Sequence, residues 1–95
     1  MQIRKYELAI SDSSIPLSIP KDSSILSVGC SPQGNHNVVC MWVRVNPELA
    51  KNSGLDTMRC FKVLATEQDF PDHWISLGTV VNPPFAWHVF EVVDK

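Results

Sequence analysis

The chain has 95 residues, of which 44% are hydrophobic, and its eight Lys and Arg residues against ten Asp and Glu residues give a formal charge of −2. This length predicts a single domain over residues 1–95, with one core and little room for a deep active site. Because counterion release needs clustered basic residues and these are scattered, the composition excludes nucleic acid as the main partner. No run approaches the roughly 20 apolar residues of a membrane span, and no signal peptide is evident, so we expect no membrane association and a cytosolic protein.

The first two strand signals lie on either side of a polar turn. In YELAI, residues 6–10, the bulky apolar side chains alternate and share one face. SDSS at 11–14 has the composition of a turn. IPLSI at 15–19 repeats the alternation, but Pro16 and Pro20 each remove a backbone donor. We therefore expect this segment at an edge of the sheet or outside it.

The next two segments predict a hairpin. ILSVGC at 25–30 and NVVCMWVRV at 37–45 flank SPQGNH at 31–36, whose Pro, Gly and Asn residues favour a loop. If the hairpin is symmetric, Cys30 and Cys40 face each other across the two strands. Segment 37–45 is apolar on both faces, which is typical of a central strand covered on both sides, so Trp42 is expected in the core.

One segment, NPELAKNSG at 46–54, favours a helix. Asn46 can cap its first turn, Pro47 suits the first helical position, and Gly54 can end it. About two turns would form, too few to be stable without packing against the rest of the domain.

The last third of the chain alternates strands with polar connections. Strands are predicted at 58–66, 73–81 and 85–93, joined by a polar loop at 67–72 and the turn NPP at 82–84. The last segment, FAWHVFEVV, has the composition of a central strand.

Six or seven strands with one short helix predict a mostly β domain. A small β-sandwich or a partly open barrel would bury strands that are apolar on two faces. Short all-β chains leave sheet edges that can pair, so homo-oligomerisation is a further expectation.

His88 is the histidine most closely framed by apolar residues. Its position favours a half-buried side chain satisfied by a neighbouring partner. A catalytic role would need a nucleophile or carboxylate nearby. Cys40 or Cys60 could supply a thiol, whereas Glu91 falls on the other face of an ideal strand. The sequence indicates no nucleophile–base pair, so we expect a protein that is not an enzyme.

The cysteines and the acidic loop at 67–72 are the two candidate metal sites. Three cysteines form a poor disulfide framework, and the spacing of Cys30, His36 and Cys40 matches no common zinc module. Asp69, Asp72 and His73 lie within five residues in a loop before Trp74, but an oxygen-ligand loop offers more carboxylates at tighter spacing. No phosphate-binding or nucleophile motif occurs. We expect neither a metal nor another cofactor.

Three tryptophans are many for a chain of this size. Trp74 and Trp87 sit at strand beginnings, where a ring can be partly exposed. Exposed aromatic side chains anchor protein interfaces or stack on planar ligands. The simpler interpretation of both tryptophans is a core side chain near the rim of the core.

KYELAI near the start, then CMWVRVNPE, ISLGTVV and the terminal WHVFEV form an ordered set of segments. This set resembles a family of short, uncharacterised proteins encoded by tailed bacteriophages and prophages. Its members typically show an opening K-Y-E-L, a strand ending in L-P, a later L-W-A/V, a Y-I-G-T-V segment and a terminal F-H-V-F-E. This chain has KYELAI, CMWVRVNPE, ISLGTVV with Ser76 and Leu77 inserted, and WHVFEV. It departs from the pattern in having ATEQDFPDH where members often carry a G-T-G-H-like stretch, so any binding function of that stretch is in doubt.

The resemblance implies a phage genome, the cytoplasm of an infected bacterium and an accessory role, but no activity. Small acidic phage proteins of this kind often block a host machine, so the leading hypothesis is a non-enzymatic inhibitor of a bacterial complex. The target would be a defence system such as a CRISPR effector, or the transcription machinery. The residues predicted to bind this partner are the aromatic anchors Trp74, Trp87 and Phe85 and the steering acids Glu67, Asp69, Asp72 and Glu48.

A second hypothesis belongs to a different class. The chain could form a homo-oligomer that sequesters a nucleotide signal, since so short a chain needs shared walls to enclose one. His88, Arg44 or Arg59 would then contact phosphate, and a tryptophan would stack on the base.

Overall fold

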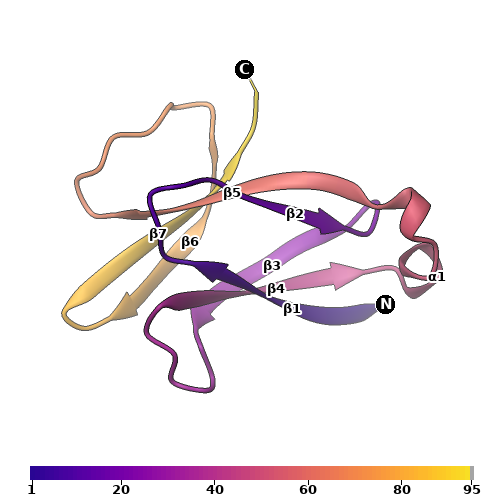
Figure 1. Cartoon of the computed structure of the whole chain (residues 1–95), viewed down its shortest axis with the longest axis horizontal. Coiled ribbons are helices and arrows are strands. Elements are labelled where there is room, and N and C mark those ends of the chain that lie inside the picture. Colours follow the sequence, from indigo (N-terminus) through magenta and orange to yellow (C-terminus); the bar gives the residue numbers. More distant parts are fainter. Residues whose placement is uncertain (95) are drawn as a thin grey trace.

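The computed structural model describes residues 1–94, which form two antiparallel sheets facing each other (Figure 1). This confirms the predicted β-sandwich. The seven strands are β1 (Gln2–Ala9), β2 (Ile15–Ile19), β3 (Ser24–Cys30), β4 (Val38–Val45), β5 (Thr57–Ala65), β6 (Ile75–Asn82) and β7 (Phe85–Val92). The sheets have the orders β1-β4-β3 and β2-β5-β7-β6.

The first sheet is built around β4, which confirms the predicted central strand. Val39, Met41, Val43 and Val45 alternate along its inner face and are all buried. Its outer face is only partly covered, and there Trp42 is half-buried over Gly29. The expectation that Trp42 lies in the core was wrong, because the second sheet covers only one face of this strand.

The second sheet has β5 and β7 in its interior and β2 at one edge, as Pro16 and Pro20 predicted. Its inner face contributes Phe61, Val63 and Val89 to the core between the sheets. Burying each such side chain contributes roughly 1.5–3 kcal/mol, so this shared core holds the two sheets together.

The two sheets meet along β3 and β6, which lie side by side. The contact is so close that a Cβ on Gly78, whose φ is 140°, would lie 2.9 Å from Val28 Cγ2. Nearby, the Cys30 thiol donates to the Val81 carbonyl at 3.5 Å. Among residues 1–94 no ladder joins the sheets, so the fold is a sandwich and not a closed barrel.

The helix α1 (Pro47–Ala50) begins as predicted, with the Asn46 side chain accepting from the Glu48 backbone N–H at 3.0 Å. It ends at Ala50 and not at Gly54, because a 3-10 turn, η1 (Ser53–Leu55), follows it. The only helices in the described part of the chain are these two short ones, and neither is long or apolar enough to cross a membrane.

The β3–β4 hairpin differs from the symmetric register. Cys30 pairs with Val39, and Gly29 pairs with Cys40. The predicted Cys30–Cys40 pair was therefore wrong, because the connecting loop shifts the partners by one residue, which sends the two thiols to opposite faces.

Candidate functional site

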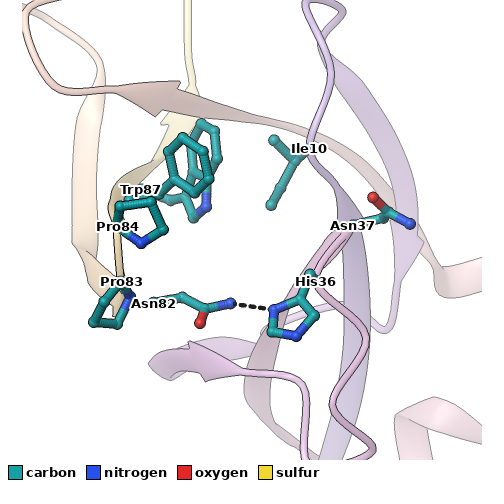
Figure 2. Close-up of a pocket in the computed structure, with 8 residues that line it drawn as sticks. Ile10, His36, Asn37, Asn82, Pro83, Pro84 and Trp87 are labelled. Atoms are coloured by element: carbon teal, nitrogen blue, oxygen red, sulfur yellow. Dashed lines mark hydrogen bonds between the residues drawn. The ribbon is translucent and has the colours of Figure 1, made fainter.

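An exposed aromatic side chain and a half-buried one lie side by side at one end of the sandwich. A hollow of about 360 Å³ opens there, between the end of β1, the β3–β4 loop and the β6–β7 turn. Figure 2 shows Pro84 and Trp87 on one side of it and Ile10, Asn37 and His36 on the other. We call this hollow the end cleft; it is lined by Ile10, His36, Asn37, Asn82, Pro83, Pro84, Phe85 and Trp87.

The aromatic wall of the end cleft is a stacked pair. Phe85 and Trp87 are two residues apart on β7, so their side chains project to the same face. Their ring centroids lie 5.4 Å apart with 24° between the planes. Phe85 is 57% exposed, whereas Trp87 is half-buried and packs against the core. The sandwich thus anchors one ring and presents the other to solvent.

The polar wall joins the two sheets. The Asn82 side-chain amide, at the end of β6, donates to His36 Nδ1 at 3.0 Å, an interaction drawn in Figure 2. Because Nδ1 accepts in this arrangement, the proton of a neutral His36 is on Nε2. Amide and imidazole groups can orient a bound chain by hydrogen bonds, and the lining includes neither a thiol nor a carboxylate.

A second hollow continues the end cleft on the other side of Trp87. It has a volume of about 370 Å³ and shares Ile10 and Trp87 with the first. Asp12 and Gln68 line its mouth, and Val63 belongs to its floor. The two hollows therefore adjoin at Ile10 and Trp87, which line both.

His88 lies on the opposite, outer face of the second sheet. Its Nε2 is 2.8 Å from the Thr66 hydroxyl, and its Nδ1 is 3.1 Å from the Thr79 hydroxyl. This confirms the half-buried, satisfied histidine. Each ring nitrogen has a hydroxyl partner, so the ring is held between β6 and the loop after β5.

The loop that follows β5 folds over the same outer face. Phe70 packs on Phe90 with ring centroids 4.3 Å apart, and Trp74 lies 6.4 Å from Phe90. These contacts hold the half-buried Trp74 away from the Phe85–Trp87 pair, which is on the inner face. The acids Glu67, Asp69 and Asp72 are exposed on this loop.

The remaining predicted site residues lie apart from both groups. Glu48 is on α1, where it pairs with Lys51 at 3.4 Å, at the other end of the sandwich. Arg44 is exposed on the outer face of β4. The seven residues predicted to bind a partner therefore do not form one surface, because strand direction and loop folding distribute them over three.

Arg59 is engaged by an internal partner. Its Nε and Nη2 donate to the Glu91 carboxylate at 2.7 and 2.6 Å, and its Nη1 donates to the Ser23 carbonyl at 2.9 Å. The hydrogen bonds to Glu91 raise the pKa of Arg59. Glu91 and His88 project to opposite faces of β7, as predicted, so Arg59 and His88 of one chain cannot bind the same phosphate.

The cysteines occupy three different environments. Cys30 is exposed, Cys60 is half-buried and Cys40 is fully buried. Burial raises the pKa of the Cys40 thiol, which keeps it protonated and unreactive. Within residues 1–94, no three His, Cys, Asp or Glu side chains gather closely enough to hold a metal ion.

Sequence reasoning identified Phe85 and Trp87 but missed the other walls of the end cleft. Ile10, His36 and Asn82 come from three segments that are far apart in the sequence. The one signal in the sequence was the turn composition of residues 82–84, which places Asn82 and the two prolines directly before Phe85.

Comparison with curated proteins finds no match, and comparison with solved structures finds none either. A family does match, over residues 1–95, and its description is "Domain of unknown function (DUF7352)". The match spans the sandwich and the end cleft alike. The chain belongs to this domain family, DUF7352.

Proposed function

We propose that the chain is a non-enzymatic binding protein that contacts a partner protein through the end cleft. The observation that carries this proposal is the stacked Phe85–Trp87 pair, in which a half-buried ring supports an exposed one. Such rigid aromatic anchors, surrounded by groups that exclude water, dominate the energy of protein interfaces.

The chemistry of the lining supports binding over catalysis. The end cleft combines apolar walls with the His36–Asn82 pair, which can fix the orientation of a partner chain. His88, the histidine that the sequence singled out, is satisfied by two hydroxyls on the other face. The lining of the end cleft contains no hydroxyl, thiol or carboxylate that could act as a nucleophile beside His36.

The resemblance to phage proteins supplies the class of partner. In that setting the partner is a complex of the bacterial host, such as a defence nuclease or RNA polymerase, and binding blocks its working surface. Glu67, Asp69 and Asp72 add negative charge to a neighbouring face and would speed association with a basic target.

The nucleotide-sequestering alternative has less support. Within one chain its three alternative phosphate ligands are separated, since Arg59 is bound to Glu91, Arg44 lies on the outer face of the first sheet and His88 lies on the outer face of the second. A phosphate group would have to displace an internal ion pair to reach Arg59.

Affinity purification from bacterial cells tests the proposal. Phe85→Ala should remove a partner that the unaltered chain retains, because losing an anchor of about 2 kcal/mol weakens binding roughly 30-fold. Ile75→Ala is the matched control, since Ile75 is 50% exposed on β6 but outside the end cleft. Equal recovery of the partner by both variants would refute the proposal.

A further inference from the structure

The four edge strands of the two sheets differ in how well they are protected. The edges of β3 and β6 lie against each other, and β2 is a five-residue strand that contains Pro16. By contrast, β1 has eight residues without proline or glycine, and its register with β4 runs unbroken from Gln2 to Ala9. A long, regular edge of this kind is a template for pairing with another strand.

The backbone groups at this edge can be assigned from the alternation of an antiparallel ladder. The Ile10 N–H donates to the Asn37 carbonyl at 2.9 Å, so Ile10 faces β4. The residues that alternate with it therefore point their N–H and C=O groups away from β4. These outward-facing residues are Ile3, Lys5, Glu7 and Ala9.

The side chains of the strand separate onto two faces. Leu8 is buried and Tyr6 packs against the core, so these two face the second sheet. Lys5 and Glu7 are exposed on the outer face of the first sheet. The two residues with unpaired backbone groups at the middle of the edge thus carry opposite charges.

We propose that β1 pairs antiparallel with β1 of a second copy of this chain, centred on Tyr6. In this register the backbone groups of Lys5 meet those of Glu7 in the second copy, and Ile3 meets Ala9. Each Lys5 side chain then lies opposite a Glu7 side chain, which stabilises a cross-strand pair. Two symmetric pairs of this kind form in each dimer.

The charge pattern selects this register and this occupant. Shifting the strands by two residues in one direction sets Lys5 against Lys5, and the opposite shift sets Glu7 against Glu7. Like charges directly opposite each other are destabilising. Lysine on an edge strand ordinarily discourages pairing, but here the second copy offers a carboxylate at the required position.

The pairing joins the two first sheets into one continuous sheet across the dimer, with about eight new backbone hydrogen bonds. It also sets Gln2 of the second copy opposite Ile10, a residue that lines the end cleft. The inference does not depend on the proposed function, because it rests on β1 alone.

Sedimentation equilibrium on purified full-length chains tests the proposal through charge reversal. Lys5→Glu and Glu7→Lys each convert both cross-strand pairs to repulsive ones and should weaken dimerisation at least tenfold. The double variant restores opposite charges and should recover the original constant within about threefold. Lys51→Glu and Glu48→Lys are matched controls, because they change the net charge equally at an exposed pair that lies outside β1.

Three outcomes would overturn the inference. The first is an unaltered chain that stays monomeric up to about 1 mM. The second is a dimer that none of the β1 variants weakens. The third is a folded double variant that stays as weak as the single ones. Far-UV circular dichroism on each variant establishes that the sandwich is retained, as expected for substitutions of exposed side chains.

Discussion

Replacing Glu91 by alanine should destabilise the domain more than a typical single substitution. The Glu91 carboxylate accepts from two guanidinium nitrogens of Arg59 at 2.6 and 2.7 Å, and the two side chains are only 11% and 23% exposed. The substitution leaves Arg59 half-satisfied, with the Ser23 carbonyl as its remaining partner.

The size of the loss follows from this burial. Breaking a buried ion pair by removing one partner costs about 3–5 kcal/mol. Because Arg59 retains some contact with water, we expect the lower end, about 3 kcal/mol of unfolding free energy. For a domain of this size that corresponds to a fall in Tm of about 12–24 °C. The exposed Glu48–Lys51 pair is the control, and Glu48→Ala should change stability by less than about 0.5 kcal/mol.

Urea and thermal unfolding of three variants would check the reasoning. Arg59→Met combined with Glu91→Leu removes both charges and should recover most of the stability that Glu91→Ala loses, since apolar side chains of similar size can replace a buried pair. A loss below about 1 kcal/mol for Glu91→Ala, or a double variant no more stable than it, would refute the account of this pair.

Two further predictions concern packing and titration. Gly78→Ala should lower the free energy of unfolding in urea by more than about 2 kcal/mol, because the added Cβ would meet Val28 in a backbone conformation that favours glycine. Gly34→Ala, which has open space around it, should cost about 1 kcal/mol. Equal losses for the two variants would contradict the close β3–β6 contact. Burial raises the pKa of the Cys40 thiol in the folded chain above the ordinary cysteine pKa of about 8.5. The free energy of unfolding should therefore fall as the pH rises above about 8.5, because the unfolded chain then loses a proton that the folded chain keeps, and the full stability should be present below that pH. Cys40→Ala should flatten that alkaline decline, and an unchanged slope in pH-dependent unfolding would show that burial does not control this thiol.

Local pattern was enough to place the strands of this sandwich. The alternation of residues 15–19 matches β2, and the apolar run at 37–45 matches β4 to within one residue. The start of β1 was missed because Gln2, Arg4 and Lys5 are polar, and an exposed edge strand needs no apolar alternation over its whole length. The amino-acid composition of a strand therefore indicates how far its side chains are buried more directly than it indicates which strand it pairs with.

Arrangement in space was harder to predict, since it depends on contacts between distant residues. The Cys30–Cys40 pairing failed through a one-residue shift in a loop, and Trp42 lies outside the core because one face of β4 has no covering layer. Trp74 and Trp87 looked alike in sequence, yet Trp74 packs on Phe90 and Trp87 stacks on Phe85. Which face each ring takes follows from the register of β6 and β7.

Only part of the candidate site could be predicted from the sequence. The aromatic composition of 85–87 pointed to Phe85 and Trp87, but the His36–Asn82 hydrogen bond joins residues 46 positions apart. The acids predicted to steer one partner lie on two segments, the loop after β5 and α1, which are at opposite ends of the sandwich. Charge alone did not indicate where in space each acid would lie.

Photo-cross-linking from the end cleft tests the central claim most directly. A photoreactive phenylalanine analogue would replace Phe85 in one variant and Ile75 in another, and bacterial cells producing each would be irradiated. Both positions are exposed, but only Phe85 lines the end cleft. The account predicts a covalent adduct with a single partner polypeptide from position 85 and none from position 75. Adducts of equal yield from both positions, or a co-purifying partner that never cross-links to position 85, would contradict it.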